Sequence, residues 1–202
     1  AGKPDVAILI VGIGRQNAEK SLREYLVSNK ADIVFTSGFA GGLNPDLKIG
    51  DIVFEIANRQ SSIVNDFEPP DVGCYEKLIA AGAKPVKFFC ADRIATTVSE
   101  KKKLRDETGA DAVEMESAAI HAVCKERGIP CVTVRVISDT VHEDLPLDFN
   151  LLAKPDKSLD FGKLAWAIAK SPGKIGALMD LQKKTSFAAE RLAAVLEKLI
   201  SP

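Results

Sequence analysis

The hydrophobic positions of this chain fall into short apolar blocks separated by longer stretches in which apolar and polar residues alternate. The blocks are rich in valine and isoleucine, which favour strands buried in a sheet. We expect strands at Val6–Val11, Ile33–Thr36, Gly50–Ile56, Pro85–Cys90 and Ile129–Ile137. The alternation of such blocks with helix-like stretches is typical of a mostly parallel sheet.

Helices are expected where apolar residues recur every three or four positions. The expected helices span Gln16–Asn29, Tyr75–Ala81, Thr97–Glu107, Glu116–Arg127, Phe161–Lys170 and Gly176–Leu199. Ser99 is the expected N-cap of the third helix, and Asn58–Gly73 is polar and predicts a loop. The pattern therefore predicts an α/β fold over residues 1–202 as a single domain. Its three α/β/α layers would enclose a mixed, mostly parallel sheet, with a helical C-terminal tail from about residue 158 to 200.

The composition narrows the class of protein. The 202 residues are 46% hydrophobic and 27% charged, which is ordinary for a globular protein, and the net charge of -1 gives no reason to expect nucleic acid or an anionic membrane as partner. The four cysteines form no CxxC pair, so we expect neither disulfides nor a metal site. The apolar run near the start is too short to span a bilayer, and we expect a cytoplasmic protein.

Ligands of open α/β sheets bind beyond the carboxyl ends of the strands, and a glycine turn follows the first predicted strand here. This turn is Gly12-Ile13-Gly14. A nicotinamide-dependent oxidoreductase would need a third glycine for close helix–sheet packing, but that position holds Asn17. The turn therefore predicts either backbone contact with a polar ligand or a tight turn without one.

The segment Gly38–Gly42 follows the second predicted strand and contains three glycines. As a loop it would leave backbone N–H groups open to a ligand oxygen. The alternative is a turn into the next element.

Acidic residues surround the most apolar strand. Glu114 and Glu116 lie where a predicted strand meets a helix, and Asp139 follows the strand Ile129–Ile137. Taken singly, Glu116 would complement a helix dipole and Asp139 would cap a turn. Because buried carboxylates need partners, their joint position at one sheet edge favours a ligand site.

Four ordered blocks of the sequence resemble the superfamily of nucleoside phosphorylases and methylthioadenosine/S-adenosylhomocysteine nucleosidases. The blocks are Val113–Ala119, Val134–Asp139, Gly12–Gly14, and Ala40–Leu43 followed by Lys48–Val53. The tail, with Leu145-Pro146 and Ser171–Lys174, is similar to the hopanoid-associated phosphorylase-like branch, which is assigned the release of adenine from a nucleoside bearing a polycyclic lipid.

The resemblance implies cleavage of the N-glycosidic bond of a purine nucleoside, with adenine as the expected base. Glu116 would hold the ribose hydroxyls against Met115, and Asp139 would be the acid at purine N7. Ile94 and Ala95 would line the base pocket. The base would leave from an oxocarbenium-like sugar, which water or phosphate would capture.

The resemblance also implies substrate contacts for several further residues: Glu114, Ser138, Gly38, Phe39, Ala40, Gly41, Gly14 and Arg135. The sequence departs from the family at the co-substrate. Phe39 stands where the hydrolases carry serine, Thr36 stands where bacterial phosphorylases carry arginine, and the acid that activates water lies on an N-terminal strand that we expect to precede this sequence. Arg15, Arg93 and Arg135 are candidate anion sites, with structural roles as the alternative.

The implied protein is an N-ribosyl hydrolase or a purine nucleoside phosphorylase that uses no cofactor and takes phosphate, if at all, as co-substrate. Its partner would be a small-molecule nucleoside, and a homodimer or larger homo-oligomer is expected. The departures at Phe39 and at the water-activating acid leave an alternative, a nucleoside-binding protein that has lost catalysis. His121 and His142 are expected to have no catalytic role.

Overall fold

The computed structural model describes residues 5–56, 72–154 and 160–200, and its centre is a mixed six-stranded sheet. The strand order is β3-β2-β6-β1-β5-β4. The strands span β1 Val34–Gly42, β2 Ile52–Ile56, β3 Lys84–Pro85, β4 Phe88–Cys90, β5 Ala112–Glu114 and β6 Cys131–Asp139. β1 and β6 are parallel, whereas β1 with β5 and β2 with β6 are antiparallel, so the expected mixed α/β sheet is confirmed.

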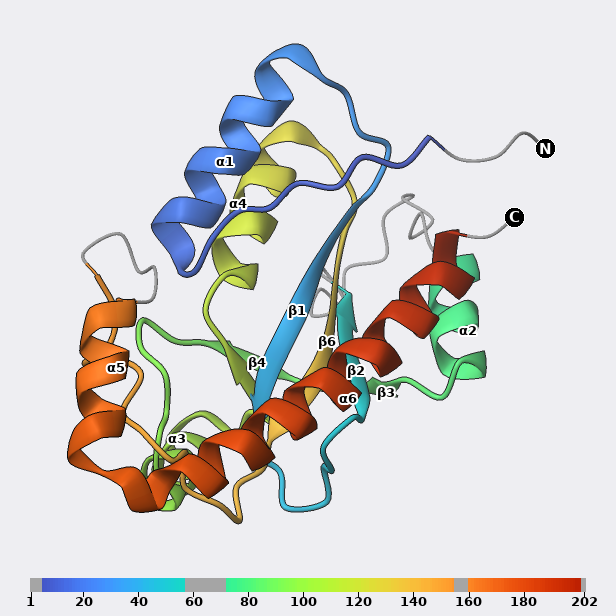
Figure 1. Ribbon diagram of the computed structural model, residues 1–202. Coiled ribbons are helices and arrows are strands. Elements are labelled where there is room, and N and C mark those ends of the chain that lie inside the picture. Colours follow the sequence, from blue (N-terminus) through green and yellow to red (C-terminus); the bar gives the residue numbers. More distant parts are fainter. Residues whose placement is uncertain (1–4, 57–71, 155–159, 201–202) are drawn as a thin grey trace.

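Helices lie on both faces of the sheet (Figure 1). α1 (Arg15–Ser28) packs with α4 (Ser117–Arg127) on one face, and their core includes Cys131 of β6. α2 (Val72–Ala80) and α6 (Ile175–Ile200) pack on the other face against Val132, Val134 and Val136. Alternate residues of β6 therefore point to opposite layers, as a strand requires.

The remaining helices are α3 (Val98–Thr108), α5 (Phe161–Lys170) and the short 3₁₀ helix η1 (Pro172–Lys174). The helices expected from periodicity are confirmed to within a few residues of their bounds. The predicted loop Asn58–Gly73 lies mostly outside the described residues. Within the part of the chain that the structure describes, no helix is long and apolar enough to cross a membrane.

The sheet is strongly curled, because one short segment reaches both of its ends. The sequence predicts a single strand at Pro85–Cys90, but this is wrong: β3 pairs with β2 at one end of the sheet and β4 pairs with β5 at the other. Side chains from five strands or their flanks, including Val53, Phe88 and Ile137, form one apolar cluster. The curl brings together residues that a flat sheet would keep apart.

The glycine-rich segment Gly38–Gly42 is not a loop. The strand predicted at Ile33–Thr36 continues through it as β1, where Gly41 and Gly42 pair with β5 and a register shift falls between Ala40 and Gly41. The prediction that a loop here leaves backbone N–H groups open to a ligand is therefore wrong, because the segment is part of strand β1. The glycines instead leave room for side chains of β6, as described below.

The segment Val6–Val11 is apolar but forms no strand, so that prediction is also wrong. Ile8 and Ile10 are about 90% exposed, and only Val11 packs, in part, against the core under α1. An apolar block becomes a strand only when a neighbouring strand supplies hydrogen bonds, and the sheet ends at β3 and β4.

The N-cap of α3 is Thr97 rather than the expected Ser99, and we predict that removing its hydroxyl destabilises the protein. The Thr97 hydroxyl accepts from the backbone N–H of Glu100, whose carboxylate accepts from the Thr97 backbone in return. Thr97→Ala should lower the free energy of unfolding by about 1 kcal/mol. Ser99→Ala, at an exposed neighbouring position, should leave it unchanged in the same urea titration. Equal losses in both variants would contradict the assignment of the cap.

Candidate active site

The side chain of Glu114 is fully buried at the end of β5 and organises the start of α4. One of its oxygens accepts from the backbone N–H groups of Glu116 and Ser117, at 2.9 and 2.8 Å, and the other accepts from the Ser117 hydroxyl at 2.6 Å. Glu114 therefore caps the N-terminus of α4, where backbone donors and the helix dipole favour a negative charge.

Glu116 is the N-cap residue of α4, but its carboxylate makes no capping hydrogen bond. One oxygen instead accepts from the backbone N–H of Gly14 at 2.8 Å. Gly14 has a φ of 89°, a conformation that favours glycine. The glycine turn before α1 therefore positions the Gly14 N–H to donate to Glu116. Because Glu114 does the capping, Glu116 keeps acceptor positions free for another ligand.

Arg135 on β6 joins the two glutamates. Its Nη2 atom donates to Glu114 at 2.8 Å and to the Thr36 hydroxyl at 3.2 Å, and lies 3.4 Å from Glu116. Gly38 lies beside Arg135 in the register, and a Cβ at position 38 would lie 2.6 Å from a guanidinium nitrogen. One cation thus faces two carboxylates, which leaves a net negative charge at this point.

Asp139 at the end of β6 is held by a lysine that the sequence analysis did not identify. The side chain of Lys101 on α3 is fully buried, and its Nζ lies 2.5 Å from one oxygen of Asp139 while donating to the carbonyls of Thr140 and Glu143. The Ser138 hydroxyl donates to the other oxygen at 2.9 Å. Gly41 leaves room for this carboxylate, since a Cβ there would lie 3.3 Å from it.

The predicted base-pocket residues Ile94 and Ala95 lie between β4 and α3, where Asn150 holds the backbone of Ile94. The Asn150 amide both accepts from the backbone N–H of Ile94 and donates to its carbonyl, each at 2.9 Å. The chain after Asp139 is tied to the same segment by a hydrogen bond from Leu145 to Thr96. Asn150, like Lys101, was missed because its partner lies far away in the sequence.

Phe39 does not share the strand face of the charged cluster. In the register it lies beside Val136, whose side chain is part of the core under α6, whereas Gly38 lies beside Arg135. Phe39 is 46% exposed. Met115 is partly buried between the two glutamates in the chain. The substrate contacts expected of these residues stay predictions.

Two of the candidate anion-binding arginines have acidic partners other than Glu114 and Glu116, although the charge of Glu114 also acts on Arg15. Arg15 donates to the carbonyl of Cys90 and lies 3.5 Å from Asp92, and Arg93 lies 2.9 Å from Glu100. With Arg135 between two glutamates, each of the three has an acidic partner. Among the described residues no group of three or more His, Cys, Asp or Glu could hold a metal.

Of the two histidines, His121 lies near enough to Glu114 and Arg135 for their charges to act on its ring. Burial lowers the pKa of His121, whose ring is 2.8 Å from the Thr133 hydroxyl. His142 is exposed and lies 3.1 Å from the carbonyl of Pro45.

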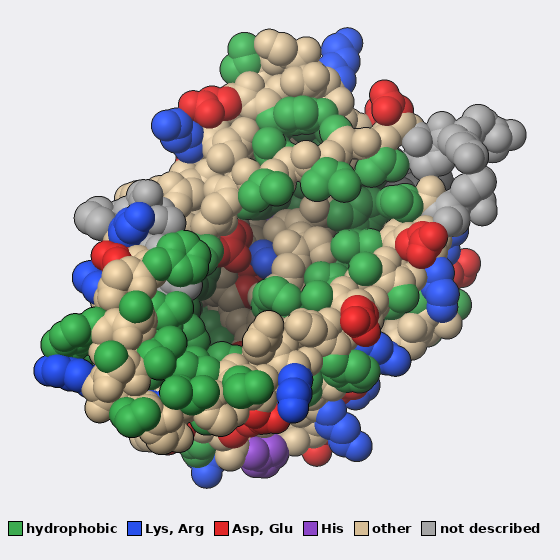
Figure 2. All heavy atoms as spheres, viewed as in Figure 1, with side chains coloured by type: hydrophobic (Ala, Val, Ile, Leu, Met, Phe, Trp, Pro, Cys, Tyr) green, Lys and Arg blue, Asp and Glu red, His purple; other side chains and the backbone are tan. Residues whose placement is uncertain are grey.

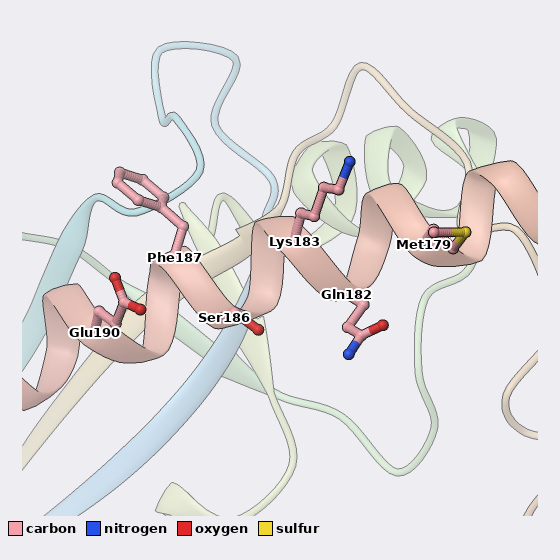
Figure 3. A pocket seen from close by; sticks show the side chains of 6 residues that line it. All are labelled: Met179, Gln182, Lys183, Ser186, Phe187 and Glu190. Atoms are coloured by element: carbon pink, nitrogen blue, oxygen red, sulfur yellow. The ribbon is translucent and has the colours of Figure 1, made fainter.

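Figure 2 shows the molecule hollowed near the start of α4, with acidic and basic side chains on the inner wall. A second, shallow hollow of about 400 Å³ lies along α6 and is lined only by residues of that helix between Met179 and Glu190. Figure 3 shows its side chains leaving different sides of α6, so they do not converge on one point. The hollow near the start of α4, whose wall carries charged side chains, is the better candidate site.

We predict that the buried ion pair between Lys101 and Asp139 contributes measurably to the free energy of unfolding of the protein. Lys101→Met should lower the free energy of unfolding by about 3 kcal/mol, because it leaves a buried carboxylate without its cation. Lys102→Met, at the adjacent exposed position, should cost little. Combining Lys101→Met with Asp139→Asn should recover part of the loss, measured by urea unfolding. A double variant no more stable than Lys101→Met would contradict the pairing.

Comparison of the sequence with known proteins identifies the family of this chain. A model described as the phosphorylase superfamily matches residues 1–170. A 5′-methylthioadenosine/S-adenosylhomocysteine nucleosidase of Shewanella halifaxensis is 31% identical over 172 residues, 74% of each chain, and one of an Exiguobacterium species is 29% identical over 192 residues, 84% of this chain and 82% of the relative.

Solved structures show the same fold. Futalosine hydrolase of Helicobacter pylori aligns with a TM-score of 0.64 and 20% identity, covering 94% of this chain and 76% of that one. The Neisseria meningitidis nucleosidase in complex with methylthio-immucillin-A aligns with a TM-score of 0.63 and 20% identity, covering 95% and 78%. On the evidence of the matched residues and the relatives, the chain belongs to the phosphorylase superfamily.

Proposed function

We propose that this protein cleaves the N-glycosidic bond of an adenine nucleoside by hydrolysis. The observation that carries the proposal is a pair of carboxylates that the structure fixes by different contacts. Glu116 accepts from the backbone N–H of Gly14 and keeps acceptor positions free, and Asp139 is paired with the buried Lys101. The relatives that align over most of the chain are named as nucleosidases of 5′-methylthioadenosine and S-adenosylhomocysteine, so the expected substrate carries a 5′ substituent.

The charge at Glu116 suits a sugar that becomes cationic as the base leaves. Glu114, Glu116 and Arg135 together carry a net charge of -1, on side chains that are at most 14% exposed. Fixed charges aimed at a developing charge of opposite sign stabilise a transition state strongly. Glu116 would accept hydrogen bonds from the ribose hydroxyls, with Met115 against the sugar.

Asp139 would hold the proton at purine N7, which draws electrons out of the glycosidic bond. Lys101 and Ser138 each contact one oxygen of Asp139 and fix its orientation. Lys101 acts through Asp139 and is a positioning residue. Ile94, whose backbone is hydrogen-bonded to Asn150, and its neighbour Ala95 would border the base.

Water is favoured over phosphate as the nucleophile because the three candidate anion-binding arginines are already ion-paired. Arg15, Arg93 and Arg135 each have a carboxylate partner, so binding a phosphate dianion there would require breaking an ion pair.

The second candidate is a nucleoside-binding protein without catalysis. One observation favours it: the position where the hydrolases carry serine holds Phe39, which lies beside the core residue Val136 on the neighbouring strand. We further propose a cytoplasmic protein of one domain over residues 1–202 that uses no cofactor and assembles as a homodimer or larger oligomer.

We predict release of free adenine from methylthioadenosine and adenosine, with inosine as a comparison, when the protein is incubated with each and the base is measured by chromatography. The rate should not change when phosphate is added, because water captures the sugar. Strict dependence on phosphate would replace hydrolysis with phosphorolysis. Tight nucleoside binding by calorimetry without any release of base would favour the second candidate.

We predict that Asp139→Asn and Glu116→Gln each lower kcat/KM roughly 100-fold or more, since each removes a group acting on the reacting atoms. Glu107→Gln, at an exposed position of α3, is the matched control and should leave kcat/KM unchanged. Unfolding curves of all three variants would separate lost catalysis from lost stability. Unchanged turnover in Asp139→Asn would exclude the proposed role of this acid.

A further inference from the structure

The chain that follows Asp139 runs alongside the segment that leads into α3. We name residues 140–150 the acid loop and residues 94–101 the pocket segment. The side chain of Lys101, at the end of the pocket segment, contacts Asp139 and donates to two carbonyls of the acid loop, at 2.8 and 3.1 Å. The start of the acid loop is therefore fixed to the first turn of α3.

Further contacts follow in antiparallel order along the acid loop and the pocket segment. The carboxylate of Asp144 accepts from the backbone N–H of Val98 at 2.6 Å, and the backbone N–H of Leu145 donates to the carbonyl of Thr96 at 2.8 Å. The partners of successive acid-loop residues thus move from the end of the pocket segment towards its beginning. This series fixes where the pocket segment lies relative to Asp139.

The series ends at Asn150, whose amide makes three hydrogen bonds. Its oxygen accepts from the backbone N–H of Ile94 and its nitrogen donates to the Ile94 carbonyl, each at 2.9 Å. The same nitrogen donates to Asp148 at 2.9 Å, and this carboxylate also accepts from the Asn150 backbone N–H at 3.0 Å. Because an ionised carboxylate only accepts, Asp148 fixes which way round the Asn150 amide lies.

We propose that Asn150 is a positioning residue for the base of the nucleoside. It holds the backbone of Ile94, which with Ala95 would border the base, and the acid loop connects it to Asp139, the proposed acid at purine N7. Asn150 thereby sets the position of the base-binding wall relative to the acid, and it acts through Ile94. This inference deepens the proposed function and rests on it.

Asn44 provides a matched control, because its amide has the same kinds of partner elsewhere. It donates to the carboxylate of Asp111 at 2.9 Å and accepts from the backbone N–H of Asp46 at 3.0 Å, and neither partner belongs to the acid loop or the pocket segment. Asn44 and Asn150 are both half-buried. A variant at Asn44 therefore measures what the loss of such an amide costs the fold by itself.

The test compares Asn150→Asp with Asn44→Asp. Each substitution keeps the shape of the side chain and places a second carboxylate beside an aspartate, but only the first removes the donor to Ile94. We expect Asn150→Asp to raise KM for methylthioadenosine and adenosine roughly tenfold and to change kcat less than about threefold, because contacts of the base with its wall weaken equally before and during bond cleavage. Asn44→Asp should leave both constants unchanged.

A milder variant, Asp148→Asn, leaves the Asn150 side chain in place but removes the charge that orients its amide. It should raise KM in the same direction by a smaller factor. Urea unfolding curves show which variants are folded, and Asp148→Asn provides the test if Asn150→Asp is not. An unchanged KM in the folded variants, an equal rise in Asn44→Asp, or a loss confined to kcat would overturn the positioning role while leaving the proposed reaction intact.

The outcome for the unaltered protein separates this inference from the proposed function. If it binds nucleoside without releasing base, the dissociation constant measured by calorimetry replaces KM, and the same differences between the Asn150 and Asn44 variants are expected. An unaltered protein that neither cleaves nor binds methylthioadenosine or adenosine would overturn the proposed function, and the role of Asn150 with it.

Discussion

Glu114, at the end of β5, joins the start of α4 to β6 through one buried carboxylate. It accepts from the backbone N–H groups of Glu116 and Ser117, from the Ser117 hydroxyl and from the guanidinium of Arg135. An ionised side chain removed from water in this way costs several kcal/mol unless every acceptor position is matched, and here backbone donors, a hydroxyl and a cation match it. Because Glu114 fills the capping position, Glu116 is released from it. The acceptor positions that Glu116 keeps free thus depend on its neighbour Glu114.

The glycines of β1 and the curl of the sheet make this arrangement possible. Gly38 and Gly41 lie where any Cβ would crowd Arg135 and Asp139, so the strand next to β6 must lack side chains at these positions. The curl then carries α3 close enough for Lys101 to reach Asp139 from outside the sheet. Substitution at these glycines would act on the site through the positions of two charged side chains.

The sequence by itself determined the helices and the strand that became β6, and it singled out Glu116 and Asp139 as candidate site residues, because periodicity and motif order are local properties of the chain. It failed at Val6–Val11, at Pro85–Cys90 and at Gly38–Gly42, where an apolar or glycine-rich block takes its structure from whichever strand lies beside it. Only the tertiary structure decided that Gly14 donates to Glu116 and that Lys101 pairs with Asp139. Those contacts join residues far apart in sequence, and no local pattern encodes which distant donor a curled sheet will bring to a buried charge.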